Sequence, residues 1–286
     1  MSSHVIHPST NRQLEAFRAR PAQAVVLVGP TGSGKFTLAG SLAEAVLGLV
    51  PGGLAGHGYV SVIRPEQGKA IGIEAVRSLD HFLSLKVPGP PAAYDRSVII
   101  EDSQLLTLEA QNALLKILEE PPAGTLIILT ANHERALLPT IRSRLQAVTV
   151  QPPDKAELRS YFSGQGFEPA AIDKSYAISG GLTGLMSALL READHPLLQA
   201  TEEARQLLSR PVYERLTMVD QLAKQKELAA DTLTILQQMA RVSLLTASGP
   251  AAKRWQAVLR ASYRASEALA NNGQPKLVMT NLALQF

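Results

Sequence analysis

The chain has 286 residues and 45% hydrophobic residues, with 28 Lys and Arg against 25 Asp and Glu, and it contains no cysteine. The missing cysteines exclude disulfide bonds, a thiol nucleophile, an iron–sulfur cluster and a thiolate zinc site, and the apolar content argues against disorder. The net charge of +3 is spread over both halves, so we expect no free-standing nucleic-acid binder. Neither a signal-peptide core nor an apolar run of about 20 residues is present, which indicates a cytoplasmic protein with no membrane contact.

The first half alternates short apolar runs with amphipathic segments, which is typical of an α/β domain with a mainly parallel sheet. Thr10 and Gln13 have the spacing of a capping box, so we expect them to start a short helix that ends at Pro21. Strands are expected at 24–28, 59–63, 97–100, 126–130 and 147–150. Helices are expected at 35–49, 71–86 and 107–120.

The second half changes character after Pro152 and Pro153. Ala, Leu, Gln, Lys and Arg dominate there and no strand-like run recurs, so we expect residues 151–286 to be helical throughout. Gly180 and Gly181 interrupt this pattern, and a further boundary is expected at about 195–210. Length alone predicts two or three domains.

A glycine-rich loop lies between the first predicted strand and the next helix. It consists of Gly29, Pro30, Thr31, Gly32, Ser33, Gly34 and Lys35. GxxxxGK in this context predicts a phosphate cradle, because glycines let backbone N–H groups converge on phosphate oxygens and the lysine reaches the outer phosphates. The strand, helix and lysine together argue against a merely flexible turn.

The residue after the lysine departs from the phosphate-loop consensus. The consensus has Ser or Thr, whose hydroxyl binds Mg²⁺, but this chain has Phe36. Thr37 comes about 100° further around the helix, so it could face an α-phosphate but cannot take over the metal. We therefore expect an intact cradle that lacks its metal ligand.

Two acids follow the third predicted strand. The run ending in Glu101 and Asp102 is similar to the apolar run ending in Asp-Glu of P-loop ATPases, where Asp supports Mg²⁺ and Glu polarises the attacking water. The two acids are exchanged here, so neither side chain has the length that its position requires. A solvated turn is the alternative interpretation, and the phosphate loop upstream favours the functional one.

Residues 97–146 resemble the bacterial clamp-loader ATPase family, whose members carry an NALLKxLEEPP helix and a TIxSRC motif. The two motifs stand here as NALLKILEEPP (112–122) and TIRSRL (140–145), and the resemblance covers most of residues 20–150. It implies an AAA+ P-loop domain at 1–151, a helical lid at 152–205 and a helical collar for oligomerisation at 206–286.

Within that family the chain is most similar to the delta-prime group, whose nucleotide sites are often eroded, rather than to the gamma/tau motors. Phe36 and the exchanged acids fit an eroded site. So does Gly184, which stands about where the motors have a second sensor arginine. The family's four-cysteine zinc module is missing, since its place holds only residues 51–58 with the lone His57, and no zinc or other metal site is expected.

The resemblance also implies roles for several side chains. Arg144, with Ser143 beside it, would be an arginine finger given in trans to a neighbour's ATP, although a helix-terminal arginine can also pair with a local carboxylate. Asn132 would sense the γ-phosphate, and Thr130 is the less favoured alternative for this role. Lys116 is a weak candidate for approaching DNA. Leu108, Leu115 and Leu118 should form the buried stripe of its helix.

The resemblance implies a subunit of the DNA polymerase III clamp loader, which helps load the sliding clamp on primer-template DNA during DNA replication. Its partners would be gamma/tau and delta subunits in a hetero-pentamer. ATP or ADP would be bound weakly or without hydrolysis, and the missing hydroxyl puts Mg²⁺ in doubt. One alternative is a gamma/tau-like motor that hydrolyses ATP itself. A remote one is a P-loop kinase, which leaves the two long motifs without a purpose.

Overall fold

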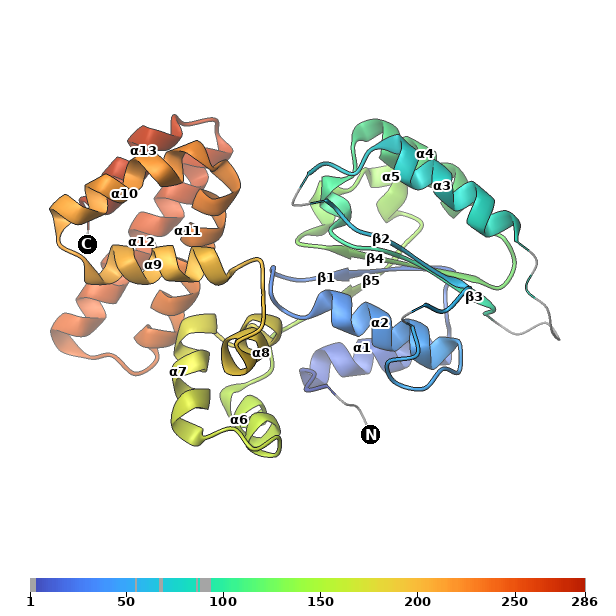
Figure 1. Cartoon of the computed structure of the whole chain (residues 1–286), viewed down its shortest axis with the longest axis horizontal. Coiled ribbons are helices and arrows are strands. Elements are labelled where there is room, and N and C mark those ends of the chain that lie inside the picture. Colours follow the sequence, from blue (N-terminus) through green and yellow to red (C-terminus); the bar gives the residue numbers. More distant parts are fainter. Residues whose placement is uncertain (1–3, 55, 67–68, 86, 88–93, 286) are drawn as a thin grey trace. The chain divides into compact units, whose positions relative to one another are not determined.

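The computed structural model describes residues 4–285, except residues 55, 67–68, 86 and 88–93. The chain divides into two compact units, Met1–Pro153 and Asp154–Phe286 (Figure 1). Within the described ranges, no helix is long and apolar enough to cross a membrane.

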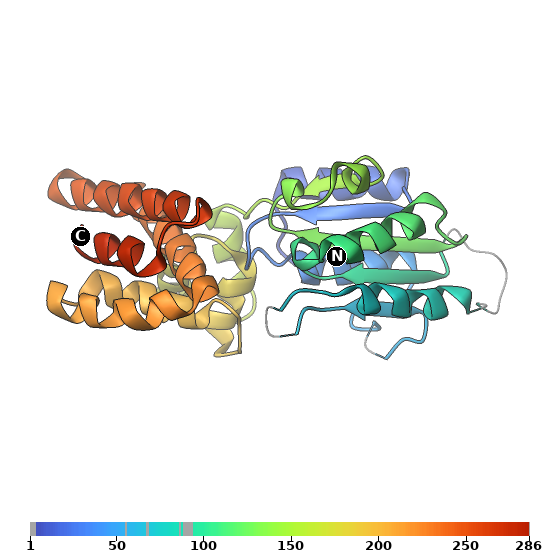
Figure 2. The ribbon, with the colours of Figure 1, turned by 90° about the horizontal axis from the view of Figure 1, so that it is seen from above.

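The first unit is built on five parallel strands in the order β2-β3-β4-β1-β5 (Figures 1 and 2). The strands are β1 (Ala24–Val28), β2 (Val60–Ile63), β3 (Arg96–Ile100), β4 (Thr125–Ala131) and β5 (Gln146–Thr149). The helices are α1 (Pro8–Ala19), α2 (Lys35–Val46), α3 (Ile73–Ser84), α4 (Leu108–Glu119) and α5 (Pro139–Arg142), with short 3-10 turns η1 (Ser103–Leu105) and η2 (Glu134–Ala136). Every predicted strand is present, and the predicted parallel α/β fold is confirmed.

Helices cover both faces of this sheet, with α1 and α2 on one side and α3 and α4 on the other (Figure 1). Successive strand side chains point to opposite faces. Val25 and Leu27 of β1 therefore pack with α1 and α2, whereas Ala24 and Val26 pack with α3 and α4. The central strands β1, β3 and β4 are buried on both faces and need nearly continuous apolar residues, which explains why they were predictable from short apolar runs.

The start of α1 differs from the prediction. The helix begins at Pro8, and the His7 side chain caps it in place of Thr10. Thr10 lies inside the helix, where its hydroxyl donates to the Thr149 carbonyl at 2.9 Å, and the side-chain Oε1 of Gln13 accepts from the Thr149 N–H at 2.9 Å. The two side chains thus satisfy backbone groups of β5 at the edge of the sheet, which explains their spacing without a capping box.

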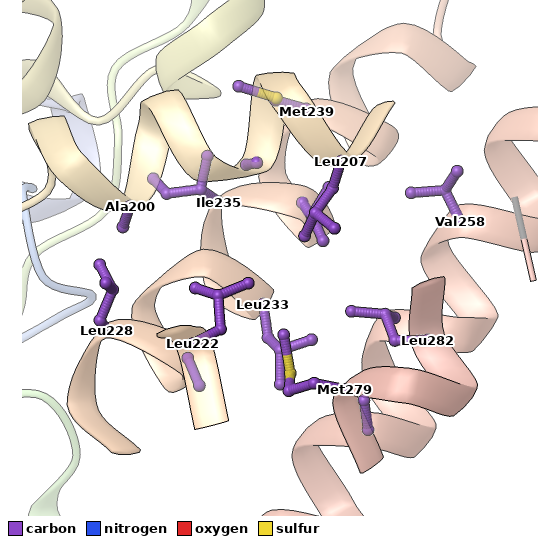
Figure 3. Packing of buried hydrophobic residues seen from close by; sticks show 14 of the residues in the cluster. Ala200, Leu207, Leu222, Leu228, Leu233, Ile235, Met239, Val258, Met279 and Leu282 are labelled. Atoms are coloured by element: carbon purple, nitrogen blue, oxygen red, sulfur yellow. The ribbon is translucent and has the colours of Figure 1, made fainter. Parts of the chain in front are cut away.

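The second unit is helical over its described residues, as predicted. Its helices are α6 (Lys155–Ser163), α7 (Pro169–Ser179), α8 (Thr183–Arg191), α9 (Leu198–Ser209), α10 (Val212–Lys224), α11 (Lys226–Leu244), α12 (Gly249–Ala270) and α13 (Pro275–Ala283). One apolar cluster runs from Leu182 to Ala283, and Figure 3 shows Leu233, Met279 and Leu282 converging in it. The division of this unit into lid and collar stays a prediction.

Candidate functional site

The candidate site lies where four neighbouring parallel strands end. In the order β2-β3-β4-β1, the residues just after these strands are Arg64, Glu101, Asn132 and Gly29. Carboxyl ends of parallel strands meet at one edge of the sheet, which is where open α/β sheets bind ligands. Residues far apart in sequence are thereby brought together with the phosphate loop.

The phosphate loop has the backbone of an anion cradle. Gly32 and Gly34 have φ angles of 81° and 83°, a left-handed conformation that glycine adopts without strain. Gly34 is the N-cap of α2, and it has no side chain that could accept from the first N–H groups of the helix. These N–H groups therefore face the loop without a side-chain acceptor, as in helix N-termini that bind anions. A Cβ atom on Gly29 would lie 2.6 Å from the Val150 carbonyl oxygen, so this position requires glycine.

Lys35 is the first residue of α2 and is only 5% exposed. Its Nζ donates to the Pro30 carbonyl at 3.0 Å and to Asn132 Oδ1 at 3.1 Å. Burial lowers the pKa of Lys35 from 10.5 to about 8, although the carboxylates of Asp102 and Glu101 oppose this shift. A phosphate in the cradle would supply the negative charge that this buried ammonium lacks.

Asn132 is the polar residue that reaches the phosphate loop from β4. Its Oδ1 accepts from Lys35 and, at 3.1 Å, from the Thr31 hydroxyl. Thr130 instead supports the acidic turn, because its Oγ1 accepts from the Asp102 backbone N–H at 3.0 Å. The geometry therefore suits Asn132 for sensing a bound phosphate better than Thr130.

Phe36 occupies the position at which the consensus provides a metal-binding hydroxyl. An arginine covers its ring, with the Arg64 guanidinium carbon 4.2 Å from the ring centroid. Arg64 Nε also lies 3.2 Å from Glu101 Oε2. Thr37 is exposed one position further along α2. Phe36, Arg64 and Glu101 thus form one continuous contact chain beside the phosphate loop.

The two acids after β3 have different surroundings. Burial raises the pKa of Glu101, and the nearby Asp102 adds to the rise, whereas Arg64 and Lys35 oppose it. Asp102 has a left-handed backbone, with φ at 49°, and its Oδ1 accepts from Gln104 Nε2 at 3.0 Å. Glu101 is therefore held by Arg64, and the Asp102 carboxylate is directed towards Gln104, which donates a hydrogen bond to it.

Arg144 comes two residues after the end of α5 and pairs with a carboxylate of its own chain. Its guanidinium lies 2.8 Å from Glu119 Oε1 at the end of α4 and donates to the Thr140 carbonyl at 2.9 Å. Ser143 Oγ also donates to Thr140, at 3.0 Å. The arginine side chain is 37% exposed. A phosphate from outside can therefore reach Arg144 only in competition with Glu119.

Three other residues from the sequence analysis lie elsewhere. Lys116 lines a groove of about 390 Å³ between α3 and α4, together with Arg77. Gly184 lies in α8 of the second unit. His57 accepts from the Tyr59 N–H through Nδ1, and in the described part of the chain no cluster of three or more His, Cys, Asp or Glu residues could hold a metal.

Two residues of this region were not predicted from the sequence. Arg64 is the first, and Gln104 is the second, since its amide links the Asn132 N–H to Asp102. A usable signal was present for Arg64, because it follows the predicted strand 59–63 directly, just as Glu101 follows the strand 97–100. Residues at equivalent ends of parallel strands are candidates for contact. No comparable pattern points to Gln104.

Comparison with known proteins gives one family. A family model described as "DNA polymerase III, delta subunit" matches residues 9–154. A protein named DNA polymerase III subunit delta' from Pseudomonas aeruginosa is 34% identical over 57% of this chain and 54% of its own length. Its namesake from Escherichia coli is 32% identical over 47% of this chain and 40% of its own length, so the chain spans about half the length of these relatives or less. A solved gamma subunit-related protein from Thermotoga maritima is 20% identical, with a TM-score of 0.47 over 96% of this chain and 97% of that one.

Proposed function

The chain belongs to the DNA polymerase III delta-subunit family, and on that basis we propose that it is a delta-prime-type subunit of a clamp loader. In this role it works with gamma/tau and delta subunits in a hetero-pentamer that loads the sliding clamp on primer-template DNA. The observation that carries the proposal is the ion pair of Arg144 with Glu119, which joins the TIRSR segment to the NALLKILEEPP helix. Both long motifs of the family thus meet in one place of the phosphate-loop unit.

The nucleotide site of this subunit holds ATP or ADP without turning it over. The groups available to the phosphates are the backbone of residues 29–34 and the side chains of Lys35, Thr31 and Asn132. Hydrolysis needs a carboxylate that is free to polarise water. Asp102, at the water-polarising position, accepts a hydrogen bond from Gln104. Glu101, at the metal-supporting position, is engaged by Arg64, and Phe36 has no oxygen for Mg²⁺. These features support binding without hydrolysis.

Arg144 serves the ATP of a neighbouring subunit in this proposal. A guanidinium fork placed against a γ-phosphate stabilises the charge of the transition state, with an effect of roughly 10³ to 10⁵ on the rate where a finger acts. In the free chain Glu119 holds the fork at 2.8 Å. A phosphate carries more negative charge than one carboxylate, so binding of the neighbour's ATP can displace Glu119.

The decisive experiment uses the reconstituted complex. Arg144→Ala should strongly lower the DNA-stimulated ATPase rate of the complex, whereas Lys35→Ala in this subunit should change it much less. Arg135→Ala is the matched control, because Arg135 is exposed on η2 a few residues before Arg144. Equal effects of the Arg144 and Lys35 variants, or no effect of Arg144→Ala, would contradict the proposal.

Two further measurements separate the alternatives. A delta-prime-type subunit should co-purify with gamma/tau and delta when the proteins are expressed together. The purified chain alone should not hydrolyse Mg²⁺-ATP on primed DNA. Robust turnover that Lys35→Ala abolishes would instead identify a gamma/tau-like motor.

A further inference from the structure

Arg64 brings a second positive group to the phosphate loop. It follows β2 directly, its guanidinium lies over Phe36 at 4.2 Å, and its Nε contacts Glu101 at 3.2 Å. The residue after the loop lysine and the acid at the end of the third strand are the two positions from which P-loop sites hold Mg²⁺. In this chain both positions contact one arginine.

A magnesium ion does not fit these surroundings. Mg²⁺ requires near-octahedral oxygen ligands and is usually held by carboxylates and phosphates. Phe36 offers no oxygen, and Glu101 already pairs with Arg64. A divalent ion beside the guanidinium would also be repelled, at a separation where the charges interact strongly. The residues present therefore disagree with the metal that the phosphate-loop pattern implies.

The cradle for the phosphates is nevertheless complete. Gly32 and Gly34 keep their left-handed geometry and Lys35 is buried beside them. Ser33 is 6% exposed, and its buried hydroxyl has no hydrogen-bond partner among the described residues, although buried polar groups are normally paired. A cradle with an unpaired buried hydroxyl and a desolvated ammonium is suited to an anion. The cradle lacks only the positive charge that Mg²⁺ supplies in other P-loop sites.

We propose that this subunit binds the polyphosphate of a nucleoside di- or triphosphate without Mg²⁺, and that the Arg64 guanidinium takes the place of the metal. This inference rests on the nucleotide site of the proposed function and concerns its cation alone. A guanidinium presents planar, paired donors that match phosphate oxygens. The ion pair with Glu101 engages Nε, so the terminal nitrogens can serve the phosphate.

Glu101 is a positioning residue in this arrangement. By holding Nε it fixes the guanidinium over Phe36, and the ring in turn provides a flat apolar surface for it. The carboxylate at the position that supports Mg²⁺ in a motor subunit is thereby used to orient a cation. Binding without metal and loss of hydrolysis then have one structural cause.

The test is a titration of the full chain with a fluorescent ADP analogue, in EDTA and in excess Mg²⁺. The wild-type chain should bind at least as tightly in EDTA as in Mg²⁺. Arg64→Ala should weaken binding in EDTA about tenfold or more, as expected from losing charge-assisted hydrogen bonds. Arg64→Lys keeps the positive charge but not the paired donors of the guanidinium, so its affinity in EDTA should lie between those of the wild-type chain and Arg64→Ala. Arg77→Ala is the matched control, since Arg77 is an equally exposed arginine paired with Glu74 on α3.

A reciprocal variant makes the test sharper. Phe36→Thr combined with Arg64→Ala restores a hydroxyl and releases Glu101, so Mg²⁺ should now strengthen binding. Wild-type binding that Mg²⁺ strengthens tenfold, wild-type binding that Arg64→Ala leaves unchanged, or no nucleotide binding in either buffer would each overturn the inference. Co-purification with the other subunits is scored separately. A chain that assembles but fails the titration overturns this inference and leaves the clamp-loader role standing, and one that passes the titration but does not assemble overturns the clamp-loader role alone.

Discussion

Lys35 shows how a single buried charge can weaken a fold at a proposed ligand site. Its pKa is about 8 in the folded chain and 10.5 without burial. Between these two values the unfolded chain holds a proton that the folded chain has released, so the free energy of unfolding rises with pH across this window. Below about pH 8 both states carry the charge, and the folded state bears the full cost of burying it.

Lys35→Met should therefore raise the free energy of unfolding at pH 7, by about 1–3 kcal/mol, because it removes a buried charge. This advantage over the wild-type chain should shrink as the pH rises from about 8 to 10.5. Urea denaturation of the wild-type chain and of Lys35→Met over a pH series measures this difference in unfolding free energy. Lys116→Met, at an exposed lysine of α4, should show no such trend. An advantage that stays constant with pH would contradict the argument.

Gly29 gives a second prediction at this scale. Gly29→Ala would place a methyl group 2.6 Å from the Val150 carbonyl oxygen, and both backbones are held by N–H bonds to the ends of neighbouring strands, Gly29 to Ala131 and Val150 to Val28. We expect a loss of about 1–3 kcal/mol, the usual range for overpacking a close contact. Gly72→Ala is the control, because nothing lies within 4 Å of its Cβ position and its φ of −78° suits any residue. Equal losses of unfolding free energy for the two variants, compared by urea denaturation, would show that the Val150 contact is unimportant.

At the level of elements, periodicity predicted the existence of the strands and helices better than their packed faces. The central strands β1, β3 and β4 were clear because they are buried on both sides of the sheet, whereas the edge strands β2 and β5 are buried only in part. In α4 the predicted apolar stripe was partly wrong: Leu118 is 7% exposed as expected and Leu115 packs partly buried against the core, but Leu108 is 58% exposed. Besides Leu118, the helix buries Ala110 and Leu114, so that these three residues follow one another at spacings of four. Leu108 is its first residue and lies off this stripe.

The candidate site was predictable to the extent that it is local in sequence. The phosphate loop and the residues after β3 and β4 lie in short patterns whose chemistry is recognisable. The pairing of Arg64 with Glu101 could not be predicted in the same way. This contact depends on β2 lying next to β3, with Ile63 opposite Ile100. Strand order is a property of the whole sheet and is not encoded in either segment alone.

The contact of α1 with β5 leads to a prediction about elements. The Thr10 hydroxyl donates to the Thr149 carbonyl at 2.9 Å and accepts from the Gln151 N–H at 3.0 Å, and the residue is fully buried. Thr10→Val keeps the shape but leaves both backbone groups unpaired, which should cost about 1–3 kcal/mol of unfolding free energy. It should also speed hydrogen exchange of the Gln151 amide.

The control for this prediction is Thr37→Val, at an exposed threonine of α2. It should change the free energy of unfolding by no more than about 0.5 kcal/mol, since surface substitutions are usually small. If Thr10→Val is as mild as the control and leaves the Gln151 amide protected, the side chain does not hold the edge strand.

At the scale of the whole molecule, the two units owe their cores to different kinds of contact. The first depends on parallel strand pairs distant in sequence, such as Val26 with Leu129. The second is formed by successive helices, and α11 and α12 pack as neighbours in sequence and in space. Local contacts form faster than distant ones, so we expect the helical unit to fold first after dilution from denaturant.

Each unit should also unfold by itself, because each has its own apolar core. Leu233 is fully buried among the helices of the second unit, and Figure 3 shows it beside Met279. Leu233→Ala should destabilise this unit by about 2–5 kcal/mol through the cavity that it leaves. Leu245→Ala, at a residue that is 77% exposed, should have little effect.

The measurement is residue-resolved hydrogen exchange on the full chain, which reads the stability of both units in one sample. With Leu233→Ala, amides of α11 and α12 should exchange faster, whereas amides of β1 and β4 should keep their wild-type rates. Residues 154–285 expressed alone should give a helical circular dichroism spectrum and one cooperative transition. Uniformly faster exchange throughout the chain would mean that the units unfold together, and the second unit would then depend on the first for its fold.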